Sequence, residues 1–442
     1  MKKYRVRWDR VAMLVAGIVL SVIIIYYIIA GIIAAARWCL ALFDGSDDAV
    51  ADKVEVVKVS RAQLLESQRM TRRLDSLMSV PMRLDTAKIA VSVYDLTTQQ
   101  PVYAFHEKSL LPPASCMKIA TAVAALKRLG FGHTYKVSLL TRGVMKADTL
   151  VGSLMLLADD DPLFEDFTAL TRRLKQRGIN CVKGNIYLNL ARKDTLRAHP
   201  TAKVWDIPFN RTPVLLKGER HVERNLRYAL AAAGVRYVKD SSVKPGGKYN
   251  YVATVTHKLT DVITPMMIHS SNIKADALLY HLDFKRGLQK DQMDWNVRHD
   301  TELFCQETFS ADGGDAMRGF VFNDGSGLSP DNRLTAAFLV EMLKYAYADA
   351  SIRRYFIDEA LATPDSGARR GSLLSRLSHP DYRGRIFCKT GTMTTKGGSS
   401  LAGYIYSNDG HWYAFAIINV DSPVAEARIF QDKLCKMMIK AK

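Results

Sequence analysis

The feature that most constrains this chain is an uncharged apolar run at residues 11–36. About 20 residues suffice to cross the hydrocarbon core of a membrane, whereas the apolar region of a signal peptide has only about 7–15. We therefore predict an uncleaved signal anchor, a single membrane-spanning helix, near the N-terminus. A cleaved signal peptide is the alternative, because Ala34, Ala35 and Ala36 are small residues near the end of the run.

The residues before this run predict how the chain is inserted. Residues 1–10 contain five Lys or Arg side chains and a single Asp. Basic residues that flank a span stay on the cytoplasmic side of the membrane. We therefore expect a single-pass protein of the cytoplasmic membrane, with the folded part of the chain outside it.

The net charge of the 442-residue chain is strongly positive, at +18. Such a balance suits a nucleic acid, an anionic membrane surface or an acidic polymer as a neighbour. The Lys and Arg residues are spread along the chain, and no zinc-ligand spacing or RNA-binding aromatic motif accompanies them. We predict no nucleic-acid partner and favour an anionic membrane or wall polymer, with mere solubility as the alternative for most individual basic residues.

Six cysteines are too sparse to form a disulfide scaffold, and none belongs to a C-x-x-C pair or a metal-ligand spacing. Most are expected to be buried or unpaired thiols: Cys39, Cys116, Cys181, Cys305, Cys388 and Cys435. Three consecutive carboxylates, Asp159, Asp160 and Asp161, suggest a metal site. We prefer a solvated turn before Pro162, and we predict no metal and no cofactor.

Strands and helices come in blocks along the chain, which is typical of an α+β architecture. Short runs rich in Val and Ile predict strands, and longer apolar runs predict helices. The expected strands are 87–96, 101–105, 135–142, 149–158, 182–190, 249–255, 385–389, 399–406 and 412–420. The expected helices are a membrane-proximal one at 54–78, then 115–129, 226–233, 276–282, 335–348 and 425–438.

The first candidate for chemistry is Ser115, three residues before Lys118 at the start of a predicted helix. One helical turn places residues i and i+3 on the same face, so the hydroxyl would lie beside the amine. A desolvated, neutral amine can accept the hydroxyl proton and activate the serine as a nucleophile. A plain helix N-cap is the alternative for Ser115.

Local context separates Ser115 from two other serines with a lysine at the same spacing. Ser241 precedes Pro245 and two glycines, which would break any helix that it opened. Ser271 lies inside the second candidate motif, in which Ser270 and Asn272 place a hydroxyl and an amide just before a predicted helix. Taken alone, this second motif is better explained as another helix cap.

The third candidate is the run Lys389, Thr390, Gly391 and Thr392 on a predicted edge strand. The lysine supplies charge, the threonine supplies a hydroxyl, and the glycine would let a substrate backbone approach closely. A K-T-G run arises by chance in roughly one chain in ten of this size. The three motifs in this order are therefore far less probable as an accident than any of them alone.

In the order S-x-x-K, S-x-N and K-T-G, the motifs resemble those of the serine penicillin-recognising enzymes. Residues 91–97 (VSVYDLT) and 112–122 (PPASCMKIATA) resemble the opening of the class C low-molecular-mass penicillin-binding proteins, which are D-Ala-D-Ala carboxypeptidases and endopeptidases. Residues 270–278 (SSNIKADAL) and 323–329 (NDGSGLS) resemble further segments of that family. The resemblance covers most of residues 87–420.

The resemblance implies the fold of the serine β-lactamases and penicillin-binding transpeptidases, an antiparallel sheet with flanking helices plus an α-helical lobe. The mostly β middle of the chain would be an inserted domain. About 150 residues separate Lys118 from Ser270, fewer than in well-known members, so a nested extra domain is expected to be missing or reduced. The predicted parts are a signal anchor at 1–43, a linker and membrane-proximal helix at 44–80, a penicillin-binding peptidase domain at 81–130 and 265–442, and an inserted domain at 131–264.

For the site, the resemblance implies a two-step acyl transfer. Ser115 would attack the carbonyl between two D-alanines with Lys118 as the base, and the backbone N–H groups of Ser115 and Thr392 would form the oxyanion hole. Ser270 and Asn272 would relay protons to the leaving amine and hold the substrate amide. Water would then release the acyl-enzyme.

The same resemblance assigns the terminal carboxylate of the substrate to Lys389 and Thr390. A β-lactam would mimic the substrate and leave the nucleophile acylated. Cys116 lies inside one motif and Cys388 beside another, so a disulfide or redox-sensitive pair is the alternative to two inert thiols.

The predicted function is therefore that of a D-Ala-D-Ala carboxypeptidase and endopeptidase of the bacterial envelope, acting on peptidoglycan stem peptides and cross-links and inhibited by β-lactams. One alternative is a β-lactamase or esterase on the same fold, which would need rapid deacylation. Another is a non-catalytic penicillin-binding scaffold of the envelope. The intact motifs argue against the scaffold, because a chain without activity is free to lose them.

Overall fold

The structure is a computed structural model. It describes residues 61–79, 84–202, 209–284, 319–364, 367–393 and 397–440. The predicted anchor lies outside these residues, and within them no helix is long and apolar enough to cross a membrane.

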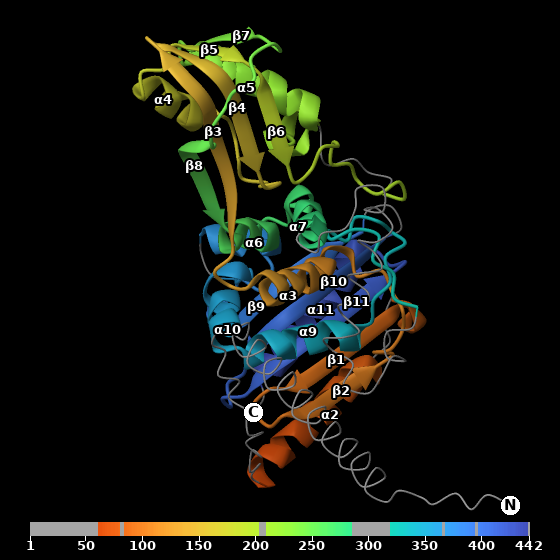
Figure 1. Cartoon of the computed structure of the whole chain (residues 1–442). Helices are drawn as coiled ribbons and strands as arrows, with labels where there is room; N and C mark the ends of the chain where they lie inside the picture. Colours follow the sequence, from red (N-terminus) through yellow and green to blue (C-terminus); the bar gives the residue numbers. More distant parts are fainter. Residues whose placement is uncertain are drawn as a thin grey trace, which may run out of the picture. The chain divides into compact units, whose positions relative to one another are not determined.

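The two ends of the described chain form one antiparallel sheet of five strands in the order β2-β1-β11-β10-β9. Its strands are β1 (Ile89–Asp95), β2 (Gln100–Phe105), β9 (Ile386–Thr392), β10 (Gly398–Tyr406) and β11 (Trp412–Val420). The early strands, drawn in orange, lie beside the late strands, drawn in blue (Figure 1). Strand β9, which carries the K-T-G run, is at one edge of the sheet, as the sequence predicts.

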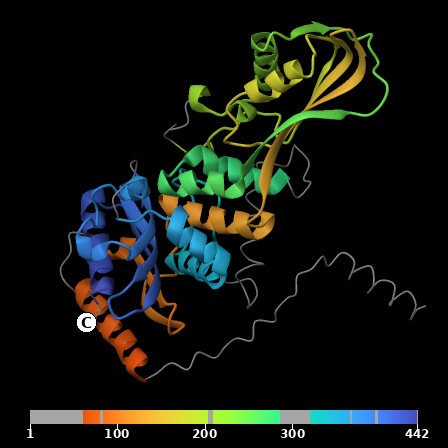
Figure 2. The ribbon, with the colours of Figure 1, turned by 90° about the vertical axis from the view of Figure 1, so that its left-hand side faces the viewer.

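The sheet is covered on both faces, and the alternation along β11 shows why its sequence is apolar throughout. Successive side chains of a strand point to opposite faces. Ala414, Ala416 and Ile418 pack in one apolar cluster, whereas Phe415 and Ile417 pack in another. The helices that cover the two faces lie on opposite sides of the sheet in Figure 2. A strand buried on both faces reads as a continuous hydrophobic run.

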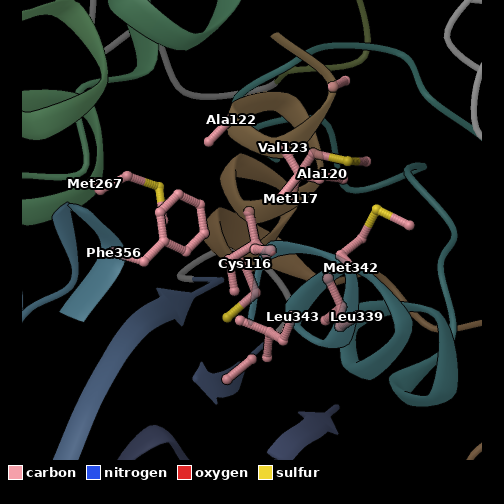
Figure 3. Close-up of a cluster of buried hydrophobic side chains, with 14 of the residues drawn as sticks. Cys116, Met117, Ala120, Ala122, Val123, Met267, Leu339, Met342, Leu343 and Phe356 are labelled. Atoms are coloured by element: carbon pink, nitrogen blue, oxygen red, sulfur yellow. The ribbon is translucent and has the colours of Figure 1, made fainter. Parts of the chain in front are cut away.

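The first face is covered by helices of an α-helical lobe. They are α3 (Met117–Leu129), α6 (Leu259–Ile268), α7 (Asn272–Phe284), α9 (Ala336–Ala348) and α10 (Ala350–Tyr355). Helix α3 lies inside this lobe and is buried from Met117 to Leu126. Its small residue Ala120 and its Met117 lie beside Met342 of α9 in the cluster of Figure 3. This packing on all sides fixes the direction of α3.

The second face is covered by α2 (Arg61–Ser79) and α11 (Val424–Ile439). Met70 and Leu74 of α2 are buried against the sheet, and Thr71 Oγ1 donates to the Val102 carbonyl over 2.7 Å. The helix predicted over 54–78 is therefore part of the folded body over its described residues.

The chain leaves the helical lobe after α3 and returns at α6. Between them lies a second sheet in the order β7-β5-β4-β3-β8, with β6 paired to β4. Its strands are β3 (Thr134–Lys146), β4 (Thr149–Ala158), β5 (Cys181–Gly184), β6 (Ile186–Leu190), β7 (Arg236–Lys239) and β8 (Asn250–Lys258). Helices α4 (Thr168–Gln176) and α5 (Glu219–Ala232) pack on it. The α+β class and the inserted β domain predicted from the sequence are confirmed, whereas α4 and β7 were not predicted and α5 begins earlier than expected.

The prediction of a solvated turn at Asp159, Asp160 and Asp161 is wrong for the last two residues, which are almost fully buried. Hydrogen bonds of 2.6 Å join Asp160 Oδ1 to His281 Nδ1 and Asp161 Oδ2 to His257 Nδ1. These partners lie about 100 residues or more away in sequence, so the run of carboxylates alone could not reveal them. The pair with His281 joins the second sheet to α7. Within the described residues, no group of three or more metal-ligating side chains could hold a metal ion.

Candidate active site

Ser115 lies in a short 3₁₀ turn, Ala114–Cys116, that leads directly into α3. Ala114 has a left-handed φ of 48°. Such a backbone costs roughly 1–2 kcal/mol for a residue other than glycine, and it persists only where the surroundings impose it. Gly327 packs so closely on this turn that a Cβ there would lie 1.8 Å from the Ala114 carbonyl oxygen. The close packing of Gly327 thus restricts the backbone of the turn, while the Ser115 side chain remains partly exposed.

Lys118, one helical turn further on, is fully buried. Its Nζ lies 3.0 Å from Ser115 Oγ, 2.6 Å from Asn272 Oδ1 and 2.6 Å from the Ser326 carbonyl oxygen. An ammonium group has three N–H donors and no acceptor. Three acceptors from three segments of the chain therefore surround this lysine.

The carbonyl of Ser326 belongs to the D-G-S-G-L-S segment, for which the sequence suggested no chemical role. Asp324 holds this loop in place from a buried position. Its Oδ1 accepts from Gly327 N over 2.6 Å and its Oδ2 accepts from Ser329 N over 2.7 Å. The loop thereby presents the Ser326 carbonyl to Lys118. The resemblance of the segment was a signal for its importance, but only the fold shows which atom it supplies.

The second motif connects the two lysines of the site. Asn272 is the first residue of α7 and bonds Lys118, while Ser270 Oγ accepts a hydrogen bond of 3.0 Å from Lys389 Nζ. Ser270 has a left-handed φ of 58°. A strained backbone at such a position is a frequent property of functional sites. The helix-cap interpretation of this motif does not account for these contacts.

Lys389 is fully buried on β9, and its Nζ also donates to the Thr390 carbonyl over 2.7 Å. Burial disfavours the charged form and lowers the pKa of Lys389 to about 8. The Thr390 hydroxyl donates to Ser372 Oγ over 2.6 Å. Ser372 was not singled out from the sequence, because it lies outside any recognisable motif.

A glycine is needed at position 391 for a structural reason in addition to the predicted approach of a substrate backbone. A Cβ at this position would lie 2.1 Å from Ser400 Oγ on β10 and 3.0 Å from the Pro113 carbonyl oxygen. Ser400 Oγ itself donates to that carbonyl over 2.6 Å. The glycine therefore lets β9 pass directly beside the turn that carries Ser115. Thr392, the next residue, is exposed at the end of the strand.

The two thiols beside the motifs are free and buried. Cys116 Sγ donates to the Lys389 carbonyl over 3.3 Å, which is a further link between α3 and β9. Burial raises the pKa of Cys116, and it raises the pKa of Cys388 to about 12. Both groups therefore remain protonated at neutral pH, and reactivity as thiolates is not expected.

The fold thus brings the three motifs together in one connected network. Hydrogen bonds run from Ser115 through Lys118 to Asn272, and from Ser270 through Lys389 to Thr390. Gly391 and Thr392 continue the same strand. A hydroxyl with an adjacent buried amine, beside a second hydroxyl with its own lysine, can carry out nucleophilic attack and proton transfer.

Solved structures share this fold and define its class. Penicillin binding protein 4 from Haemophilus influenzae matches with a TM-score of 0.66 and 18% identity, over 84% of this chain and 99% of that chain. A predatory peptidoglycan endopeptidase from Bdellovibrio bacteriovorus matches with a TM-score of 0.52 and 17% identity, over 79% of this chain and 92% of that one. The fold is that of a penicillin-binding protein with an inserted β domain.

The family follows from the sequence match over most of the chain. Residues 70–206 and 216–437 match the D-Ala-D-Ala carboxypeptidase 3 (S13) family. The chain belongs to this family of serine D-Ala-D-Ala carboxypeptidases, so the family predicted from the motifs is confirmed. A D-alanyl-D-alanine carboxypeptidase from Actinomadura sp. (strain R39) is 23% identical over 463 aligned positions, which cover 85% of this chain and 84% of that protein.

The close passage at Gly391 leads to a stability prediction. The variant Gly391→Ala forces a Cβ against Ser400 Oγ, so we expect the free energy of unfolding to fall by about 1–3 kcal/mol. Penicillin acylation should slow at the same time, because the strand must shift from the Ser115 turn. Chemical denaturation and the acylation rate measure the two effects.

Two further variants make this test specific. Gly391→Ala combined with Ser400→Gly removes the worst overlap and should recover part of the loss. Gly132→Ala adds a methyl group where no atom lies within 4 Å, and it should leave both quantities unchanged. Equal effects of Gly391→Ala and Gly132→Ala would contradict the packing argument.

Proposed function

We propose that this protein cleaves D-Ala-D-Ala peptides and cross-links of peptidoglycan through an acyl-enzyme on Ser115, and that β-lactams trap this intermediate. The observation that carries the proposal is the 3.0 Å contact between Lys118 Nζ and Ser115 Oγ within a buried site. Both carboxypeptidase and endopeptidase activity are included. The endopeptidase part is supported by the fold shared with a peptidoglycan endopeptidase.

The surroundings of Lys118 explain how it acts as a base. A neutral amine has two N–H donors and one lone pair. The carbonyl oxygens of Asn272 and Ser326 each lie 2.6 Å from Nζ and accept the two donors. The lone pair can then point toward the Ser115 hydroxyl and take its proton as the serine oxygen attacks the substrate carbonyl. The two carbonyls thus act as positioning groups for the base.

The oxygen of the attacked carbonyl gains negative charge, and we assign its stabilisation to the backbone N–H groups of Ser115 and Thr392. The C–N bond then breaks, and the leaving amine needs a proton. Ser270 Oγ accepts from Lys389, so it can give its own proton to the amine and take a replacement from the Lys389 ammonium. Water attacks the resulting ester in the second step. Its proton passes through Ser270 to Lys389, and Lys118 returns to Ser115 the proton that it took.

Two alternative functions need different properties. A β-lactamase or esterase would require rapid hydrolysis of the acyl-enzyme, and a short-lived penicillin adduct would favour it. A non-catalytic scaffold would release no D-alanine from a D-Ala-D-Ala peptide. The contacts of Lys118 with Ser115, Asn272 and Ser326 support a catalytic function over the scaffold, because a binding protein has no need to orient a buried amine.

Labelling with a fluorescent penicillin tests the nucleophile. The purified protein should show a covalent band on a denaturing gel, and Ser115→Ala should lose it completely. Ser241→Ala removes the serine of another S-x-x-K sequence, which lies in an exposed turn, and it should label as the wild type does. A band that persists in Ser115→Ala, or no band in the folded wild type, would contradict the assignment.

The pKa of Lys389, about 8, predicts how acylation depends on pH. Below that pH the amine carries the charge that holds a substrate carboxylate, and above it the charge is lost. The rate constant for acylation by a carboxylate-bearing penicillin should therefore fall as the pH rises through about 8. Rates measured from pH 6 to 10, with folding monitored by circular dichroism, would reject this role if they continued to rise to the alkaline limit.

We also propose that the apolar run at residues 11–36 anchors the protein in the bacterial cytoplasmic membrane, with its catalytic part outside. The length of the run and the preceding basic residues support this location. After labelling of intact cells with fluorescent penicillin, the labelled protein should sediment with the membranes and require detergent for release. Recovery of a shortened protein in the soluble fraction would indicate a cleaved signal peptide instead.

A further inference from the structure

An arginine from the last helix contacts the end of the edge strand. Arg428 of α11 donates from Nη2 to Thr392 Oγ1 over 3.0 Å. Thr392 follows directly on the K-T-G run, and it is exposed, while the Arg428 side chain is half-buried. No sequence motif connects these two residues, which lie 36 positions apart. The contact brings a cation to the strand beside Ser115.

No carboxylate of the described residues forms a salt bridge with this arginine. Asp432, one turn further along α11, is already bound by Arg376 through Nε over 3.1 Å and Nη2 over 2.7 Å. Asp432 thus compensates the charge of Arg376, and the nearby Arg428 leaves an excess of positive charge. Arg428 Nε is shielded from solvent and has no hydrogen-bond partner among the described residues.

Burial and the neighbouring Arg376 lower the pKa of Arg428. A shielded donor without an acceptor is costly in a folded protein. A guanidinium group nevertheless remains charged over the whole physiological range. The positive charge of this half-buried side chain thus favours the binding of an anion, and a carboxylate matches the planar fork of an arginine.

The alternation of side chains along β9 shows where that anion would lie. Lys389 and Gly391 point toward the helical lobe, where they contact Ser270 and the Ser115 turn. Thr390 and Thr392 lie on the other face of the strand, where they contact Ser372 and Arg428. Residues two apart on one face are separated by about 7 Å. The buried hydroxyl of Thr390 and the Arg428–Thr392 pair thus lie on the same side of β9, the edge strand of the sheet.

The charge of Lys389 is not freely available on that side of the strand. Its ammonium is fully buried and donates to Ser270 and to the backbone of its own strand. This lysine is therefore engaged with the group that we assign to proton transfer. Arg428 is a cation on the same side of the strand as the two threonine hydroxyls.

We propose that Arg428, held by Thr392, binds the carboxylate on the leaving-group side of the scissile amide and so makes the enzyme selective for substrates that carry one. This inference rests on the proposed function and deepens it. The class of ligand is a peptide, or a β-lactam that mimics it, with a carboxylate adjacent to the bond that is cleaved. Arg428 is thus a specificity-determining residue, and acylation chemistry itself does not need it.

Paired probes separate this role from a structural one. Benzylpenicillin carries the carboxylate and its methyl ester lacks it, and each competes with fluorescent penicillin for the nucleophile. In Arg428→Ala we expect the acylation rate constant of the acid to fall roughly 10–100-fold, as for loss of a charge-assisted hydrogen bond. The rate constant of the ester should remain within about twofold, because it makes no such contact. Arg428→Lys should recover part of the preference for the acid.

A control on the same helix completes the design. Lys433→Ala removes an exposed cation of α11 that lines a groove with Arg73 and Lys436, and it should leave the acid-to-ester ratio unchanged. An unchanged ratio in Arg428→Ala, or an equal loss for both probes, overturns the inference while wild-type acylation upholds the proposed function. Failure of both probes to acylate the folded wild type would reject the proposed function and the inference together.

Discussion

The site depends on the hydrogen bonds of one buried lysine amine. Lys118 is enclosed by the helical lobe, where a charged or half-satisfied amine costs several kcal/mol unless each donor has a partner. Those partners come from the 3₁₀ turn of Ser115, the start of α7 and the loop that Asp324 holds in place. The most distant of these partners, Ser326, lies 208 positions from Lys118 in sequence. The site therefore forms only when these segments of the lobe are correctly packed.

The sheet contributes the other half of the site through its edge. Strand β9 can lie against the Ser115 turn only because Gly391 has no side chain, and Cys116 adds a hydrogen bond across the same contact. One face of the strand then delivers Lys389 to Ser270, and the other presents Thr390 and Thr392. Because alternate residues point to opposite faces, a single strand places Lys389 beside Ser270 and its two threonine hydroxyls on the other side.

Predictions from the sequence succeeded where the signal was local. Short apolar runs located the strands of the main sheet, and the strongly apolar run after Ser115 located α3. They failed in the inserted domain, where α4 (Thr168–Gln176) is short and polar on most of its surface. They also failed at Asp160 and Asp161, whose burial depends on two histidines supplied by β8 and α7. From the sequence alone, a run of carboxylates predicts a solvated turn. Only the fold shows that these two carboxylates have buried partners.

The sequence by itself determined the chemical groups of this protein, their order along the chain, and thereby its family. Short motifs suffice to identify these groups because one turn of helix places Ser115 and Lys118 side by side at a fixed spacing. Only the tertiary structure decided which groups surround them. The Ser372 hydroxyl and the Arg428 guanidinium lie outside every motif, and the Ser326 carbonyl lies in a family-like segment whose chemical role the sequence did not show. Each contacts a motif residue from another segment of the chain. Their roles arise from packing, since contacts over such separations leave no periodic or local trace in the sequence.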